Sequence, residues 1–282
     1  MVNGGSGARI PTTQEAVAAS VSCARSLGLA AGDPVVVAEG YSVRVHLRPA
    51  PVLTRVVTAG CVLRGDPRPW QEREIAVAQF LARSGVPAVV PWSEPGPHLV
   101  NGLWVSLWQW TDHQPGAIGQ ADFGQLLDQL HEALLGYRGQ LPPLVGPLTD
   151  VNTALTISSD PLLHEAAGLL VPLALSWPQR PLHGDAHTGN VLISTVGPVW
   201  ADLEDVCVGP VEWDLASTTV TEEAVTAYPG PVDDDRLEDC RALRRLQILA
   251  GVLTDDVADP SLYEETVSAL QGRLATLRSR AG

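Results

Sequence analysis

Residues 181–190 read PLHGDAHTGN and concentrate side chains that can do chemistry. His183, Asp185 and His187 are spaced two apart, and Asn190 follows the aspartate by five residues. Alternate side chains of an extended segment project the same way, so the first three could coordinate one zinc or iron ion. The segment could also be a structural turn whose histidines bond the backbone. A third interpretation is a catalytic loop for phosphoryl transfer, in which a carboxylate accepts the proton of a hydroxyl group.

The third interpretation draws on a second segment, VWADLED, further along the chain. Two strand-like pieces, NVLIS and GPVWADLE, are joined by a tight turn and predict a β-hairpin. The hairpin would bring Asn190 and Asp202 to one end, facing the loop that carries Asp185. Phosphoryl transfer requires oxygen ligands that hold Mg²⁺ across a triphosphate, and an amide and a carboxylate provide them. The sequence therefore favours phosphoryl transfer, with the metal site and the structural turn as alternatives.

Together the two segments resemble the motifs of the aminoglycoside phosphotransferase family of small-molecule kinases. In that family the catalytic loop reads H-G-D-x-H-x-G-N, and a strand and a hydrophobic-D-x-E-D segment follow it. The corresponding segments of this chain are HGDAHTGNVLIS and VWADLEDVCVGPVEWDLA. By the same similarity Asp214, in EWDLA, would be structural and would bond the loop backbone, whereas an exposed carboxylate at a helix start is the simpler alternative.

The resemblance implies a transferase that uses ATP and Mg²⁺ and phosphorylates a hydroxyl group of a small molecule. Asp185 would be the catalytic base, and Asn190 and Asp202 would be the Mg²⁺ ligands. His183 would brace the loop. His187 is left open between bracing the loop and contacting the substrate.

The elements expected around these residues predict an α+β chain with a protein-kinase-like bilobal fold. The first part is an antiparallel, β-rich N-terminal lobe, expected over residues 1–110 and expected to bind nucleotide. The second is a helical C-terminal lobe, expected over residues 111–282, with the catalytic loop and the substrate site. The expected elements are a helix at 12–28, a β meander at 34–40, 42–48 and 52–58, a helix at 70–85, strands at 88–92 and 98–110, a helix at 121–137, a loop at 139–149 and a helix at 161–177.

Glu74 is the first sign of a buried charge in the β-rich part. On a helix it falls on the same face as Trp70, Val77 and Leu81, which form an apolar stripe. A carboxylate on such a stripe is costly to bury unless it is paired. We therefore expect Glu74 to have a cationic partner inside the fold.

Arg55 is the expected partner, and it would also replace a lysine that the kinase pattern requires. Kinases generally hold the α- and β-phosphates with a lysine on the third strand, but all 18 basic residues of this chain are arginines. In VLTRVVT the alternation places Leu53, Arg55 and Val57 on one face. Arg55 would then stand where the lysine normally does and bind phosphate, with Leu53 under the adenine. The alternative is that Arg55 faces solvent.

The rest of the nucleotide site has weaker signals. The chain has no G-x-G-x-x-G, and only Gly40, in AEGYSVRV, stands where a phosphate-covering turn is expected. Ser42 is the candidate hydrogen-bond donor beside it. A hinge within Trp108–Thr111 would offer backbone groups to the adenine, so Trp110 is assigned to the nucleotide site. Packing in the core or hinge is the alternative for these tryptophans.

The charge distribution bears on the partners. The net charge is −14, and the acidic excess lies in residues 111–282. Such a surface should repel nucleic acid and acidic membranes, so neither is expected as a partner. It favours a cationic acceptor, such as an aminoglycoside, another amino sugar or a choline-like amine. A solvated acidic exterior is the simpler explanation for most of these carboxylates, and antibiotic resistance is one option that follows from this acceptor class.

The remaining expectations concern location, oligomeric state and rival functions. The first residues lack an apolar signal region, and the four scattered cysteines fit reduced thiols, so a cytoplasmic protein is expected. Monomer and homodimer are both open. The rival functions are a catalytically inactive kinase-like module that binds nucleotide or another ligand, and a metal hydrolase built on His183, Asp185 and His187.

Overall fold

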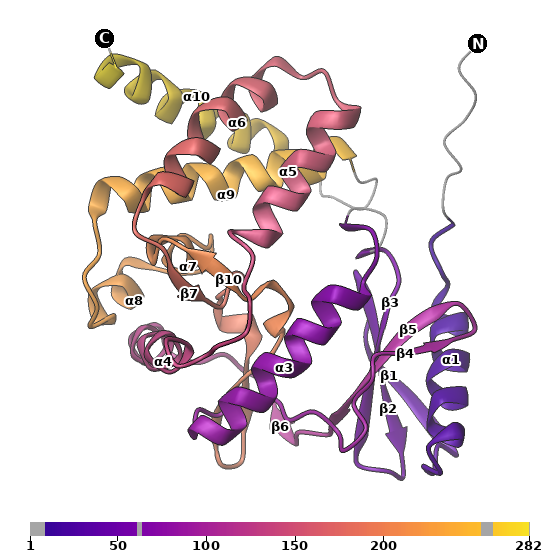
Figure 1. Ribbon diagram of the computed structural model, residues 1–282. Coiled ribbons are helices and arrows are strands. Elements are labelled where there is room, and N and C mark those ends of the chain that lie inside the picture. Colours follow the sequence, from indigo (N-terminus) through magenta and orange to yellow (C-terminus); the bar gives the residue numbers. More distant parts are fainter. Residues whose placement is uncertain (1–8, 61–63, 255–261, 282) are drawn as a thin grey trace, which may run out of the picture. The chain divides into compact units, whose positions relative to one another are not determined.

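The computed structural model of the chain describes residues 9–60, 64–254 and 262–281. The chain divides into two compact units, whose elements are labelled in Figure 1. Unit 1 comprises residues 1–79 and 89–112, and unit 2 comprises residues 80–88 and 113–282. Of the cysteines, Cys23, Cys207 and Cys240 are buried thiols outside any disulfide, whereas Cys61 lies outside the described residues.

Unit 1 is built on a five-stranded sheet with the strand order β1-β2-β3-β5-β4. All neighbouring pairs are antiparallel, and the first three strands pair in chain order, which confirms the expected meander. The strands are β1 (Asp33–Ala38), β2 (Ser42–Arg48), β3 (Val52–Val57), β4 (His98–Val100) and β5 (Leu103–Gln109).

Helix α1 (Thr13–Ser26) covers one face of this sheet and forms the core of unit 1 with it (Figure 1). The β2 and β3 residues in that core alternate along their strands, which is the period of two expected for a sheet with one face buried under a helix. Thr54 donates a hydrogen bond to Ser20 Oγ on α1 at 2.8 Å. Because Thr54 faces α1, its neighbours Leu53 and Arg55 point to the opposite face, as the alternation predicts.

The segment AVVPW, residues 88–92, was expected to be a strand, and this expectation is wrong. Its bridges to other segments are isolated ones, between Ala88 and Trp200 and between Pro91 and Trp108. Pro91 has no N–H group to donate, so it cannot continue a hydrogen-bonded ladder. The strand expected at 98–110 is instead a hairpin of β4 and β5, with Asn101 and Gly102 at positive φ in its turn.

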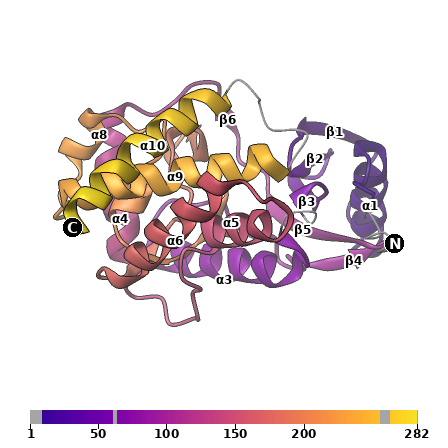
Figure 2. The same cartoon turned by 90° about the horizontal axis from the view of Figure 1, so that it is seen from above.

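In unit 2 the long helix α9 is the centre of the helical packing. Helices α5, α6 and α10 all contact it, and Figures 1 and 2 show these three beside it. Leucines, alanines and a cysteine make up most of the buried face of α9, which also includes Asp239 and Arg244. The helices are α3 (Arg68–Ser84), whose last turn belongs to this unit, α4 (Gln120–Leu134), α5 (Val145–Ile157), α6 (Pro161–Ser176), α7 (Glu212–Leu215), α8 (Glu222–Ala227), α9 (Asp234–Thr254) and α10 (Leu262–Ala281).

Helix α5 begins inside the segment 139–149, which was expected to be a loop. Gly146 and Pro147 suggested the loop, but both lie in the first turn of the helix. Backbone N–H groups of a first turn have no partner within the helix, so a proline there removes no hydrogen bond. Among the described residues, no helix combines the length and the apolar composition needed to cross a bilayer.

Short strands complete unit 2 and carry its polar loops. The expected β-hairpin is confirmed, because β8 pairs with β9 from Val191 opposite Trp200 to Ser194 opposite Gly197. The strands β7 and β10, which the sequence did not suggest, form a separate antiparallel pair. The strands are β6 (His113–Gln114), β7 (Arg180–Leu182), β8 (Val191–Ser194), β9 (Gly197–Trp200) and β10 (Cys207–Gly209). The antiparallel sheet and the helical part confirm the expected α+β class.

Candidate active site

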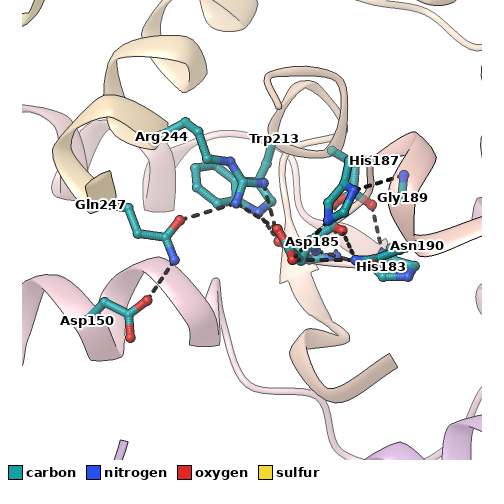
Figure 3. A network of polar contacts seen from close by, with 11 residues as sticks. Asp150, His183, Asp185, His187, Gly189, Asn190, Trp213, Arg244 and Gln247 are labelled. Atoms are coloured by element: carbon teal, nitrogen blue, oxygen red, sulfur yellow. Dashed lines mark hydrogen bonds and ion pairs between the residues drawn. The ribbon is translucent and has the colours of Figure 1, made fainter. Parts of the chain in front are cut away.

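The loop between β7 and β8 is anchored by buried residues and exposes one carboxylate. His183 is fully buried and Asn190 is 5% exposed, whereas the Asp185 side chain between them is 41% exposed. A turn of 3-10 helix, η1 (Thr188–Asn190), leads from the loop into β8. Figure 3 shows the loop residues and the side chains around Asp185. The loop therefore presents Asp185 from a fixed frame.

Both ring nitrogens of His183 contact backbone groups. Its Nδ1 accepts the Asp185 N–H at 3.3 Å, and its Nε2 lies 3.0 Å from the carbonyl oxygen of Ala201. Through these contacts the ring bonds backbone groups on both sides. They leave no nitrogen of His183 for a metal ion. Within the described parts of the chain, no group of three or more His, Cys, Asp or Glu side chains is arranged to hold one.

Asp214, on α7, holds the backbone of the same loop. Its carboxylate accepts the N–H groups of His183 and Gly184 at 2.7 and 2.9 Å, which confirms the expected bonds to loop backbone. A third contact, at 2.9 Å, comes from His131 Nε2 on α4, and Tyr228 Oη lies 3.0 Å from the other nitrogen of His131. Burial opposes the charged carboxylate, but the hydrogen bonds and the charge of His131 outweigh it and lower the Asp214 pKa.

Gly184 is required by its surroundings. Its φ is +87°, and a Cβ atom at this position would collide with the backbone carbonyl of Asp205. The Gly184 carbonyl also accepts a hydrogen bond from Trp213 Nε1 at 2.6 Å. The glycine of H-G-D therefore lets the loop pack directly against the segment that follows β9.

Asn190, just before β8, and Asp202, shortly after β9, lie at the same end of the β8–β9 hairpin. The Ala201 N–H donates to the Asn190 carbonyl at 2.8 Å, which joins the two strand ends. The Asn190 side chain donates its Nδ2 to the Asp185 carbonyl oxygen at 2.9 Å. Asp202 has left-handed backbone angles, φ 55° and ψ 53°, which cost a residue other than glycine about 1 kcal/mol or more. Since Nδ2 is engaged, the amide oxygen of Asn190 is its remaining polar atom.

The Asp185 carboxylate has a neighbour at each oxygen. Arg244 Nη1 lies 3.2 Å from Oδ1, whereas Oδ2 lies 3.5 Å from Asn190 Nδ2 and 3.7 Å from His187 Nε2. His187 Nδ1 accepts the Gly189 N–H at 3.1 Å, so the proton of the neutral ring is on Nε2. Burial lowers the His187 pKa, against the opposing charge of Asp185. His187 thus braces the loop as a neutral ring; its contact with a substrate stays a prediction.

In unit 1, Arg55 and Glu74 form the expected ion pair. Arg55 Nη1 is 2.9 Å from Glu74 Oε1, and the two side chains are 5% and 3% exposed. The Ser42 hydroxyl, expected to contact phosphate, accepts a hydrogen bond from Arg55 Nε at 3.1 Å. Leu53 is half-buried on the same face of β3, opposite Trp108 of β5. Contact of these residues with nucleotide remains a prediction.

Trp110 follows β5 and is bonded to the segment just before β3. Its N–H donates to the Pro51 carbonyl at 2.9 Å, and its ring stacks on His46 with 3.8 Å between the ring centroids. Its indole Nε1 donates to Asp112 at 2.7 Å. Since both N–H groups of Trp110 have partners, its carbonyl oxygen and its second ring face are the groups that could contact adenine.

Sequence reasoning missed the residues that surround Asp185 from the helices. Arg244 stacks on Trp213 and contacts Gln247, which in turn bonds Asp150 on α5 (Figure 3). A signal was present, because Arg244 follows Leu237 and Cys240 at the spacing of a buried helix face. The same reasoning that singled out Glu74 applies to it.

Comparison with known proteins bears on this geometry. Residues 52–249 match the model of the phosphotransferase enzyme family. The fold is similar to the amicoumacin kinase hAmiN in complex with AMP-PNP, Ca²⁺ and Ami, with 10% identity, a TM-score of 0.67 and coverage of 85% of this chain and 88% of that one. A comparison with curated proteins gives no match.

Two further solved structures share the fold. The choline kinase LicA from Streptococcus pneumoniae is 14% identical, with a TM-score of 0.65 and coverage of 90% of this chain and 99% of that one. The aminoglycoside phosphotransferase APH(3'')-Id from Streptomyces rimosus ATCC10970 is 15% identical, with a TM-score of 0.56 and coverage of 82% and 98%. The fold class is thus protein-kinase-like, and the chain belongs to the phosphotransferase enzyme family, the aminoglycoside phosphotransferase family expected from its motifs.

Proposed function

We propose that the protein transfers the γ-phosphoryl group of ATP to a hydroxyl group of a small molecule, with Asp185 as the catalytic base. One observation carries the proposal. Asp185 is the exposed carboxylate of a loop whose backbone is fixed by His183, Asp214 and Asn190. A general base needs this combination of access and fixed position.

In the proposed step the acceptor hydroxyl donates its proton to Asp185 while its oxygen attacks the γ-phosphorus. The bond between that phosphorus and the bridging oxygen of ADP breaks, so ADP leaves with the bond's electron pair. The loop contributes position, because the fixed backbone keeps the carboxylate from turning away from the hydroxyl. His187 Nε2 lies 3.7 Å from Asp185 Oδ2, beyond hydrogen-bonding distance, so this oxygen can still accept the proton of the hydroxyl.

Asn190 and Asp202 are the proposed Mg²⁺ ligands. Carboxylate and amide oxygens are the donors that Mg²⁺ prefers, and the Asn190 amide has only its oxygen left for such a bond. When bound, Mg²⁺ would neutralise charge on the phosphates. The chain's part is to hold the two side chains at one end of the β8–β9 hairpin.

Residues of unit 1 are proposed to bind ATP. Arg55 would bind phosphate oxygens, with Glu74 and Ser42 holding its guanidinium in place. Leu53 would pack against the adenine and Trp110 would contact it at the hinge. The solved amicoumacin kinase carries AMP-PNP, which supports ATP as the donor. Under this proposal the nucleotide-binding lobe is 1–110, and the lobe with the catalytic loop and the acceptor site is 111–282.

The acceptor is proposed to be a small cationic alcohol. The acidic excess of residues 111–282 supports this class, since carboxylates attract ammonium groups. The names of the similar structures add a choline kinase and an aminoglycoside phosphotransferase, whose acceptors have this charge. The same acidity makes nucleic acid and acidic membranes poor partners.

The test is an acceptor panel with mass detection. The protein is incubated with Mg·ATP and aminoglycosides, amino sugars, choline, ethanolamine and neutral sugars, and each acceptor is examined for an added phosphoryl group. Wild type should phosphorylate a cationic member, and Asp185→Asn should not. AMP-PNP binding without turnover in both proteins would instead indicate a non-catalytic binding module. A phosphorylated neutral sugar would keep the reaction but overturn the cationic class.

A further inference from the structure

A buried arginine contacts the exposed carboxylate of the catalytic loop. Arg244 lies on α9, only 8% of its surface is exposed, and its Nη1 is 3.2 Å from Asp185 Oδ1. Trp213 lies beneath the guanidinium, with 3.7 Å from the guanidinium carbon to the ring centroid. Gln247 accepts from Nη1 at 3.2 Å and donates to Asp150 at 2.7 Å (Figure 3). Arg244 Nη2 also lies 3.5 Å from the carbonyl oxygen of Gly184, so the guanidinium is held by α7, by its own helix and by the backbone of the loop.

The arrangement shows which partner holds the other. The guanidinium of Arg244 is confined by the ring of Trp213 and by Gln247, whereas 41% of the Asp185 side chain is open. An exposed aspartate has several rotamers available, and a rigid donor at one of its oxygens selects among them. Arg244 is therefore the fixed member of the pair and Asp185 is the member that is positioned.

A contribution to folding stability does not explain why Arg244 is buried at this position. An ion pair with a carboxylate that is largely open to solvent contributes little to folding. Within the described residues, the Arg244 Nε is buried and has no hydrogen-bond partner, which is unfavourable. The cost of burying this cation is thus only partly offset by contacts that stabilise the fold.

We infer that Arg244 is a positioning residue for the phosphoryl transfer. By binding Oδ1 it turns Asp185 so that Oδ2 is the oxygen offered to the acceptor hydroxyl. This inference rests on the proposed function, in which Asp185 accepts the hydroxyl proton. Arg244 acts through Asp185 and need not touch the acceptor or the nucleotide.

The experiment compares Arg244→Ala, Arg244→Met and Arg245→Ala. Methionine retains the packing on Trp213 without the charge. Arg245 is the matched control, because it is the adjacent arginine of α9 and pairs on the surface with Glu265. ADP formation is measured with Mg·ATP alone, where water is the acceptor, and with any acceptor that the panel identifies. AMP-PNP affinity and thermal unfolding are measured for each variant, and guanidinium chloride at low millimolar concentration is added as a rescue agent.

Both Arg244 variants should lose about 10- to 100-fold in kcat, the loss that a misplaced catalytic group causes, while AMP-PNP affinity stays within about twofold. Guanidinium should restore turnover of Arg244→Ala in a saturable way, and Arg245→Ala should behave as wild type. Turnover within about twofold of wild type in either Arg244 variant would overturn the inference, as would a loss in Arg244→Ala that guanidinium does not relieve. Full activity of Asp185→Asn would instead overturn the proposed base, so the two failures are distinguishable.

Discussion

The Arg55–Glu74 pair of unit 1 is buried at both partners, whereas the Arg244–Asp185 pair of unit 2 has one partner open to solvent. In the first pair both side chains are at most 5% exposed. In the second the arginine side chain is 9% exposed and the aspartate 41%. Under the proposed function the two pairs have opposite roles: Glu74 holds the arginine that binds the nucleotide, and Arg244 holds the aspartate that meets the acceptor. Burial decides how each pair responds to mutation.

The largest expected effect is on the exposed carboxylate. Asp185→Ala should lower kcat by about 10²- to 10⁴-fold, the range typical of a removed general base. The free energy of unfolding should fall by less than in Glu74→Leu, because the Asp185 carboxylate is already partly solvated. Steady-state ADP formation and urea unfolding measure the two quantities. A variant that is destabilised but still active would mean that Asp185 has a structural role and is not the catalytic base.

The buried pair should respond in the opposite way. Glu74→Leu leaves the guanidinium of Arg55 buried without its carboxylate, and this should lower the free energy of unfolding by about 3 to 5 kcal/mol. Urea unfolding of the variant beside Asp185→Ala gives the comparison directly. Glu72→Leu, on the exposed side of the same helix, is the matched control. Equal stability of the two α3 variants would mean that the Arg55–Glu74 pair is not a buried charge pair in solution.

A double variant separates the structural role of Arg55 from its proposed binding role. Arg55→Met combined with Glu74→Leu replaces both charges by apolar groups of similar size, so most of the stability lost in Glu74→Leu should return. Binding of AMP-PNP should still be weaker by about 1 to 3 kcal/mol, because the phosphate ligand is gone. Calorimetric titration measures the affinity. A stable double variant with unchanged affinity would remove Arg55 from the nucleotide site.

The smallest effect concerns the pH dependence of Asp214, which anchors the loop that carries Asp185. The folded pKa of Asp214 is below its ordinary value, so its contribution to stability is present above about pH 4 and is lost as the pH falls through the folded value. Asp214→Asn should therefore cost about 1 to 3 kcal/mol at pH 7, and the difference from wild type should shrink in acid. Urea unfolding from pH 7 to pH 3 tests this. Asp33→Asn, an exposed carboxylate, is the control, and a pH-independent difference would contradict the ionised state of Asp214.

Much of the site follows from patterns that are local in the chain. The hairpin that joins Asn190 to Asp202 needs only two short strands and a turn. The alternation along β3 and the apolar stripe of α3 each place one charge inside, and two buried opposite charges in one unit are expected to meet. In these cases the period of the element decides where a side chain points.

The network around Arg244 could not be predicted in this way. Asp185 and Arg244 are 59 positions apart, and their contact depends on how α9 packs in unit 2. Asp150 lies on α5, whose start was not predicted because Gly146 and Pro147 suggested a loop. Periodicity shows that a residue is buried, but it does not show which distant helix will be beside it.

The arginine on β3 has one practical consequence for identifying ligands of this protein. Acyl-phosphate derivatives of nucleotides act by acylating a primary amine beside the phosphates. A guanidinium is protonated at working pH and is a poor nucleophile, and the chain has no side-chain amine elsewhere. Amine-directed profiling reagents should pass over this protein even when their nucleotide part binds, so equilibrium methods are the appropriate way to detect occupancy.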